Sequence, residues 1–235
     1  MNLLEICSNI KKKKELKDIK DSLVLSLVES YLKENNINPE VKNFEKTKNY
    51  KVMFKEIRKK LRKSYGSFKE YYEPIKKEVY EKIFEITGSP KSILDLGCGL
   101  TPLDLKLNNY YAYDISSENI KKISEYFKKN NLKSKAELFD LINDNYEKLP
   151  KVHVCFLLKV LESLEAIKKN ISLEILNKIK ADFIVVSFAK KVLSNNQIIK
   201  KKGRRWFKRI LKYNFKNYET FDTDDEVFYI IRLVF

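Results

Sequence analysis

Several residue types are scarce in this chain of 235 residues, and each scarcity excludes a class of protein. The three cysteines, Cys7, Cys98 and Cys155, are odd in number and widely spaced, so we expect neither a disulfide framework nor a metal site. The chain has no apolar run of about 18 residues, the length that crosses a membrane, and its N-terminus lacks the apolar core of a signal peptide. We therefore expect a cytoplasmic protein that makes no membrane contact.

Histidine and glycine are also rare. The single histidine, His153, lies inside the apolar run 152–158, where a place in a strand is favoured over a catalytic or ligand role. Two of the five glycines, Gly97 and Gly99, fall in one turn. We expect no catalytic side chain of the acid–base type, and the glycine turn becomes the centre of the interpretation.

This turn follows a short apolar run, residues 93–96, and precedes Thr101 and Pro102, which favour the start of a helix. Glycines let the backbone approach a ligand closely, and the N–H groups that open a helix are free donors. The third residue after Gly99 is Pro102, so the spacing of a dinucleotide turn is broken. The pattern predicts a strand, a turn and a helix that hold a nucleotide-like cofactor.

Three aspartates narrow the choice of cofactor to S-adenosyl-L-methionine. Asp95 precedes the turn and suits the cationic methionine end. Asp114 and Asp140 end the next two predicted strands, where they would accept hydrogen bonds from the ribose hydroxyls and the adenine amino group. Capping of a following helix is the alternative role for each acid. The predicted cofactor site comprises Asp95, Leu96, Gly97, Cys98, Gly99, Asp114, Ile115, Asp140, Leu141, Leu157 and Leu158.

The hydrophobic periodicity predicts two domains. Apolar residues three or four apart indicate helices over 16–32, 47–63 and 74–86, which would form an all-α domain of residues 1–88. Strands and helices alternate in residues 89–235, and the end of the chain, 218–235, reads as a hairpin. We predict an α/β fold, a Rossmann-like class I methyltransferase sheet whose parallel strands are closed by a C-terminal antiparallel hairpin.

The net charge of +16 is unevenly distributed. Residues 1–88 hold 21 basic and 14 acidic residues, and residues 189–216 hold 11 basic residues and no acid, while the rest is near neutral. Two basic flanks around a neutral core indicate a polyphosphate partner, because neutralising phosphates releases counterions. Lysine-rich surface networks of heat-loving organisms are an alternative for the first flank, but not easily for the second.

Several segments carry a family resemblance. Residues 93–103, 156–165 and 183–188, together with 58–66, resemble the aminoglycoside-resistance 16S rRNA guanine-N7 methyltransferases. The resemblance implies that the glycine turn, Asp114 and Asp140 hold S-adenosylmethionine, and that the helical domain and the basic loop after the fifth strand bind rRNA. The chain departs from the family at residues 67–74, which read S-F-K-E-Y-Y-E-P, and at Ala189, where the family has proline.

Guanine N7 carries a lone pair and no proton, so methyl transfer to it requires alignment rather than a general base. Basic side chains would contact phosphates, and Trp206 would stack a displaced base, unless it packs a helix over 204–213 onto the sheet. The predicted RNA contacts are Lys59, Lys60, Arg62, Lys63, Lys190, Lys191, Lys200, Lys201, Lys202, Arg204, Arg205 and Trp206.

The leading hypothesis is an S-adenosylmethionine-dependent RNA methyltransferase that acts as a monomer on 16S rRNA in the small ribosomal subunit, at a guanine N7. The alternatives are a methyltransferase for tRNA, a protein or a small molecule, and a noncatalytic RNA-binding or ribosome-assembly factor that keeps the fold.

Overall fold

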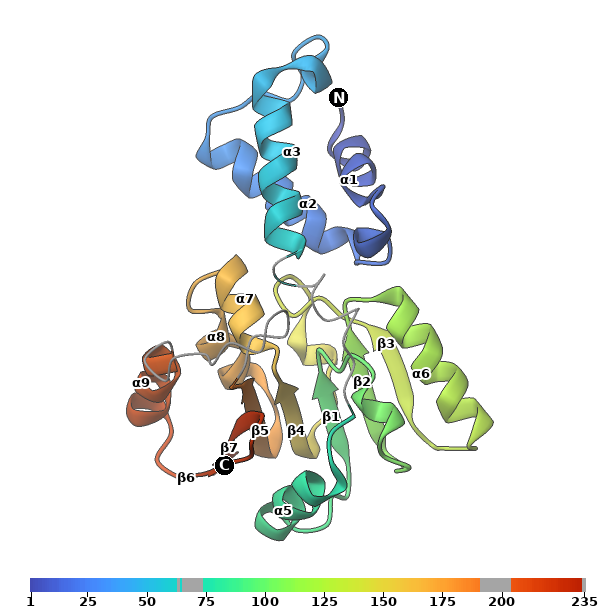
Figure 1. The fold of residues 1–235 in the computed structure, drawn as a ribbon, viewed down its shortest axis with the longest axis vertical. Coiled ribbons are helices and arrows are strands. Elements are labelled where there is room, and N and C mark those ends of the chain that lie inside the picture. The colour runs from blue at the N-terminus through green and yellow to red at the C-terminus, as the bar shows by residue number, and fades with distance from the viewer. Residues whose placement is uncertain (63, 65–73, 191–203, 234–235) are drawn as a thin grey trace.

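The computed structural model describes residues 1–62, 64, 74–190 and 204–233, in which a helical part lies at one end of a seven-stranded sheet (Figure 1). The strand order is β3-β2-β1-β4-β5-β7-β6. Strands β1 to β5 are parallel, and β7 pairs antiparallel with both β5 and β6. The strands are β1 Ile93–Leu96, β2 Tyr110–Asp114, β3 Lys135–Leu138, β4 Val152–Leu158, β5 Ala181–Ala189, β6 Tyr218–Asp222 and β7 Glu226–Arg232. This topology confirms the predicted fold class.

Strand β1 is the centre of the sheet, and all four of its residues are buried. It pairs with β2 on one side and with β4 on the other, so that Asp95 lies between Ala112 and Phe156. The strand order reverses at β1, and ligands of such sheets bind in the crevice at this reversal, beyond the carboxyl ends of the strands. The glycine turn that follows β1 lies at this crevice.

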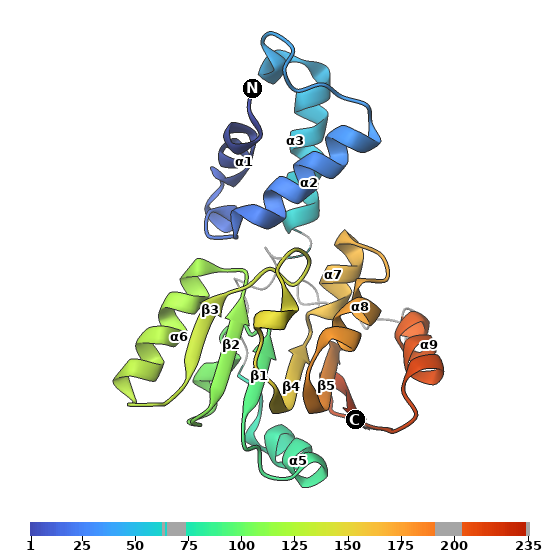
Figure 2. The same cartoon turned by 180° about the vertical axis from the view of Figure 1, so that it is seen from behind.

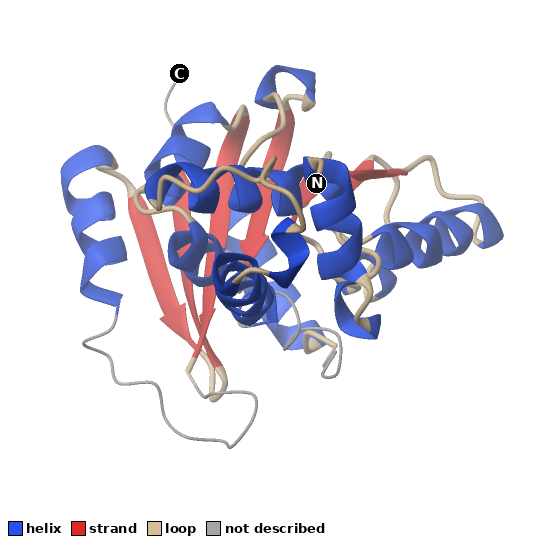
Figure 3. Ribbon diagram, turned by 90° about the horizontal axis from the view of Figure 1, so that it is seen from above, coloured by secondary structure: helices blue, strands red, loops and turns tan. Residues whose placement is uncertain are grey.

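Helices cover both faces of the sheet (Figures 2 and 3). Helices α5 Lys77–Thr87 and α6 Ser117–Lys129 pack on one face. Helices α7 Leu161–Ile167, α8 Ile171–Lys178 and α9 Arg205–Asn214 pack on the other. The apolar periodicity of residues 163–180 predicts a single helix in place of α7 and α8. That prediction was wrong because Asn170 adopts a left-handed conformation with φ 64°, and Glu165 accepts hydrogen bonds from the N–H groups of Asn170 and Ser172, which open α8.

The helical part has a core of its own, formed by α1 Leu3–Lys11, α2 Asp21–Glu34 and α3 Lys48–Leu61. The Thr47 hydroxyl accepts a hydrogen bond from the Tyr50 N–H at 3.1 Å and caps α3, as expected from the sequence. Helix α2 begins later than predicted, since residues 14–16 form a separate 3-10 turn. The core residues include Ile6, Ile10, Leu23, Val28, Met53 and Ile57.

Helix α5 belongs by packing to the sheet. Its Tyr80 and Ile83 are buried in the same core cluster as Ile93 and Phe156, whereas the core of the helical part ends at Leu61. The domain boundary at residue 88 stays a prediction, and this packing leads us to propose a boundary between α3 and α5 instead.

The helical part contacts the sheet through the loops that follow β2 and β3. The Lys20 N–H donates to the Ile115 carbonyl at 3.0 Å, and the Ser117 N–H donates to the Asp18 carbonyl at 3.0 Å. The Ser22 hydroxyl donates to Asp140 Oδ2 at 2.7 Å. These polar contacts place the helical part over the carboxyl edge of the sheet (Figure 1).

Candidate functional site

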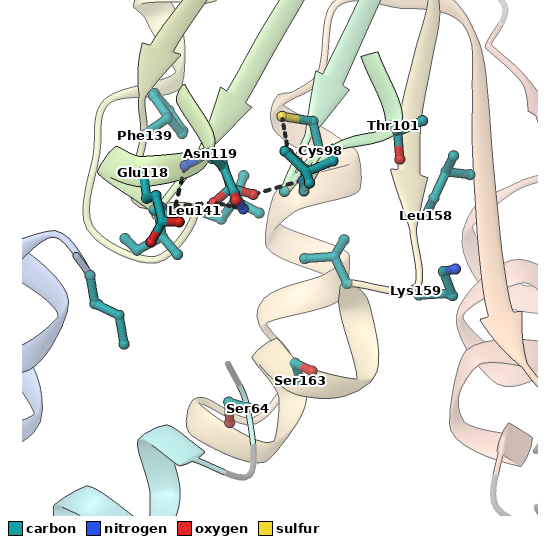
Figure 4. A pocket seen from close by; sticks show the side chains of 18 of the residues that line it. Ser64, Cys98, Thr101, Glu118, Asn119, Phe139, Leu141, Leu158, Lys159 and Ser163 are labelled. Carbon is teal, nitrogen blue, oxygen red and sulfur yellow. Dashed lines mark hydrogen bonds between the residues drawn. The ribbon is translucent and has the colours of Figure 1, made fainter. Parts of the chain in front are cut away.

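A pocket lies at the carboxyl ends of β1, β2 and β4, between the sheet and the helical part (Figure 4). The glycine turn forms one wall, the start of α6 another, and the segment after β4 a third. Glu15, Asp18, Ile19 and Ser64 of the helical part also line it. The pocket is therefore built from both parts of the chain.

The glycine turn has a conformation that requires glycine. Gly97 and Gly99 have φ values of 71° and 55°, which other residues rarely adopt. A Cβ at Gly97 would lie 2.6 Å from the Val160 side chain. The N–H groups of Gly97 and Cys98 both donate to the Tyr113 carbonyl, at 2.8 and 3.1 Å, and this fastens the turn to β2.

Asp114 lies in the pocket as predicted. Its side chain is only 7% exposed, and its two oxygens accept hydrogen bonds from the Gly99 N–H at 2.9 Å and the Ser116 N–H at 2.7 Å. Burial raises its pKa to about 6, although the hydrogen bonds from both backbone groups oppose this rise. The carboxylate is thus positioned by the turn and retains lone pairs for a ligand.

Asp95 and Asp140, also predicted to contact the cofactor, do not line the pocket. Asp95 is 1% exposed beneath the turn, where the Tyr110 hydroxyl donates to its Oδ2 at 2.7 Å, and its Oδ1 has no hydrogen-bond partner among the described residues. Burial raises its pKa to about 7. Asp140 accepts from the Ile142 N–H at 3.0 Å and from Ser22, so its carboxylate holds its own loop and the helical part. For Asp140, the alternative role of a local cap fits the structure.

Of the other residues predicted to bind the cofactor, some line the pocket and some do not. Gly97, Cys98, Gly99, Ile115, Leu141 and Leu158 line the pocket, and their contact with the cofactor stays a prediction. Leu96 and Leu157 do not line the pocket, because their side chains are buried in the core of the sheet. Burial raises the pKa of the Cys98 thiol well above its usual value, so the thiol stays protonated and unreactive.

Sequence reasoning missed the segment after β4 as a pocket wall. Lys159 has φ 58° and lines the pocket together with Val160 and Ser163. The Lys159 ammonium lies 3.3 Å from Glu226 Oε1, and the other oxygen of Glu226 accepts from the Ser187 hydroxyl at 2.6 Å. The C-terminal hairpin thus reaches the pocket through Glu226. The only signal in the sequence was the resemblance of residues 156–165, which include Lys159.

Some of the residues predicted to contact RNA are exposed in the structure. Lys59, Arg62 and Arg205 are exposed, and Lys60 is half-buried. Arg62 pairs with Glu15 at 2.7 Å, and Lys190 pairs with Asp222 at 2.9 Å. Lys63, Lys191, Lys200, Lys201 and Lys202 lie outside the described residues.

Two predicted RNA contacts need correction. Arg204 is only 6% exposed: its Nε donates to Glu162 Oε1 at 2.9 Å, and its guanidinium lies over the Phe188 ring. A guanidinium so enclosed is not available to a phosphate. Trp206 packs edge-on against Phe188, with ring centroids 6.0 Å apart, which confirms the alternative that it packs α9 onto the sheet.

Comparison with known proteins identifies the family. Residues 54–203, from α3 to the start of α9, match the family model described as ribosomal RNA methyltransferase (FmrO). The chain belongs to the FmrO family of ribosomal RNA methyltransferases. The resemblance noted in the sequence is thereby confirmed. Within the part of the chain that the structure describes, no helix is both long and apolar enough to cross a membrane.

Two curated relatives are named 16S rRNA (guanine(1405)-N(7))-methyltransferase. The protein of Frankia casuarinae is 28% identical over 123 residues, which cover 49% of this chain and 42% of the relative. That of Micromonospora echinospora is 29% identical over 122 residues, which cover 49% of this chain and 44% of the relative. The chain thus spans less than half the length of these relatives.

Solved structures of similar fold include the 16S rRNA methyltransferase RmtF in complex with S-adenosyl-L-homocysteine. It has a TM-score of 0.77 and 19% identity, and the match covers 99% of this chain and 100% of RmtF. The 16S rRNA methylase ArmA is 28% identical with a TM-score of 0.54, over 66% of this chain and 80% of ArmA. The likeness to RmtF shows that the helical part and the sheet together form one known fold.

Proposed function

We propose that this protein is an S-adenosylmethionine-dependent methyltransferase that acts on a guanine N7 of 16S rRNA. The observation that carries the proposal is the pocket itself: a glycine turn and a buried Asp114 meet at the reversal of strand order, in a chain of an rRNA methyltransferase family. The two curated relatives are named as guanine-N7 methyltransferases, which supports guanine N7 as the target.

The residues of the pocket fit an adenosyl group. Asp114 would accept hydrogen bonds from the ribose hydroxyls, because its carboxylate is already held by Gly99 and Ser116. Ile115, Phe139 and Leu141 supply apolar surface for the adenine. When bound, S-adenosylmethionine supplies a methyl group on a cationic sulfur, and the buried Asp95 below the turn contributes negative potential when ionised.

The chain's own contribution to the reaction is to position the base. Guanine presents N7 and O6 as neighbouring acceptors. Lys159 is a cation on the pocket wall, and Glu226 and Ser187 fix its direction. We propose that its ammonium donates a hydrogen bond to O6 and leaves N7 facing the methyl donor. Alignment of this kind contributes on the order of 7 to 11 kcal/mol in model reactions, without any proton transfer.

The RNA would be bound next to the pocket by the helical part. Lys51, Lys55, Lys59 and Arg62 are exposed on α3, at the spacing of one helix face. We propose that this face contacts phosphates of the small ribosomal subunit. We also propose that the protein acts as a monomer in the cytoplasm. The match to the fold of the 16S rRNA methyltransferase RmtF covers both the helical part and the sheet.

Transfer of tritium from labelled S-adenosylmethionine to 30S subunits tests the proposal. We expect label in 16S rRNA, located at a guanine by nucleoside mass spectrometry. Asp114→Asn is the control, since it keeps the shape of the side chain and removes its charge. Label in tRNA or protein would overturn the rRNA assignment, and failure to bind the cofactor would favour the noncatalytic RNA-binding factor.

A further inference from the structure

Helix α9 has two contrasting sides. Phe207 and Leu211 are buried against β5 and β7, and Trp206 and Ile210 pack beside them. The opposite side exposes Arg205, Lys208, Arg209 and Lys212, which together with Tyr213 we name the α9 cationic face. No acidic residue occurs in the helix or anywhere in residues 189–216.

The four cations of this face have no acidic partner within ion-pair distance among the described residues. Two exposed lysines elsewhere on the surface are paired: Lys168 lies 2.7 Å from Glu174, and Lys180 lies 2.6 Å from Glu147. Residues three or four apart on a helix are neighbours, so the cations of α9 repel one another. The helix therefore presents an uncompensated positive surface to anions from outside the chain.

Tyr213 is the second observation. It is 73% exposed, the largest exposed fraction among the large hydrophobic side chains of the described chain, and Lys212 lies 5.7 Å from its ring centroid. An aromatic ring beside unpaired cations is the combination with which proteins bind nucleic acids, in which the cations contact phosphates and the ring stacks on a base or sugar.

The position of α9 complements that of α3. Helix α9 lies at the flank of the sheet beside α8, whereas α3 lies in the helical part above the sheet (Figure 1). The described structure therefore carries basic surfaces on two separate elements, one from each part of the chain.

We propose that the α9 cationic face is a second RNA-binding surface, which contacts the phosphates of the RNA helix that flanks the target nucleotide. The proposal rests on the proposed function for the identity of the RNA. Its basis in charge and exposure is independent of the cofactor pocket.

The test compares two triple variants of the full chain that remove the same charge. Lys208→Ala/Arg209→Ala/Lys212→Ala alters the α9 cationic face, and Lys121→Ala/Lys128→Ala/Lys129→Ala alters exposed lysines of α6. Binding to 30S subunits is measured at several salt concentrations. We expect the α9 variant to bind at least about tenfold more weakly, with a log–log salt slope shallower by about 2 to 3, since each lost phosphate contact removes roughly 0.9.

The α6 variant should bind as the wild type does. Tyr213→Ala should weaken binding about fivefold if the ring stacks. Thermal unfolding and calorimetry with S-adenosyl-L-homocysteine should be the same for all variants, which separates loss of the surface from loss of the fold. Equal affinity and equal salt slope for the two triple variants would overturn the proposal. If the wild type transfers no methyl group to RNA while the α9 variant still loses 30S binding, the proposed function fails and the surface stands.

Discussion

The glycine turn can be tested by a pair of substitutions that separate two physical effects. Gly97→Ala places a residue at φ 71° and brings its Cβ to 2.6 Å from Val160. The left-handed backbone costs roughly 1 to 2 kcal/mol, and overpacking adds roughly 1 to 3 kcal/mol. Gly99→Ala has φ 55° and no atom within 4 Å, so only the backbone cost applies. We expect Gly97→Ala to lower the free energy of unfolding by about 1 to 3 kcal/mol more than Gly99→Ala.

For ligand binding the two substitutions should rank in the opposite order, with Gly99→Ala causing the larger loss of affinity. Gly99 lines the pocket, and a methyl group there enters space that the cofactor would occupy. Gly99→Ala should therefore weaken binding of S-adenosyl-L-homocysteine by about tenfold or more, while its stability falls only by the backbone cost of roughly 1 to 2 kcal/mol. Urea unfolding gives the first quantity, and calorimetry gives the second.

Val160→Ala supplies the control for the steric effect. It removes the atom that the new Cβ would meet, so combining it with Gly97→Ala should recover part of the lost stability, with a coupling of at least about 1 kcal/mol. Strictly additive costs in the double variant would refute the overlap as the cause. Equal destabilisation by the two alanine substitutions would refute it as well.

Three further predictions concern charge. Burial raises the pKa of Asp95 to about 7 and that of Asp114 to about 6, so the folded state holds protons that the unfolded chain releases. Stability to urea should therefore fall as the pH rises from about 4 to about 7. Asp95→Asn should flatten this decline, and an unchanged slope in this variant would contradict the prediction. Glu226→Gln keeps an acceptor for the Ser187 hydroxyl but breaks the ion pair with Lys159. The methyl-transfer rate should fall by about tenfold, while the affinity for S-adenosyl-L-homocysteine stays within about twofold. Loss of both the rate and the affinity would point to a structural role for Glu226. Arg204→Met removes the hydrogen bonds to the partly exposed Glu162 and should lower the free energy of unfolding by roughly 2 kcal/mol. A loss of RNA binding without a loss of stability would show instead that Arg204 contacts phosphate.

Local patterns were sufficient to predict the frame of the fold. The buried run 93–96, the glycine turn and the alternation that follows predict β1, the turn and the parallel sheet, and the hairpin was visible in its two short apolar runs. These features depend on the period of side chains along the chain, which a single sequence records. The position of Asp114 followed from its place at the end of a strand.

The directions of individual side chains were not predictable in the same way. Asp95 and Asp140 follow the same pattern as Asp114, but Tyr110 and Ser22, distant in sequence, determine where their carboxylates bond. In the sequence Arg204 is one of many basic residues, and only the structure shows that Glu162 and Phe188 enclose its guanidinium. Partners brought together only by the tertiary structure decide these roles.

The central claim is that the pocket at the carboxyl edge of β1 holds S-adenosylmethionine. Calorimetric titration of the wild-type chain with S-adenosyl-L-homocysteine tests it most directly, with Gly99→Arg as the variant whose side chain enters the open space of the site. The account predicts binding of one molecule per chain in the wild type and no heat of binding in the variant. A wild type that gives no heat, or a variant that binds equally well, would contradict it.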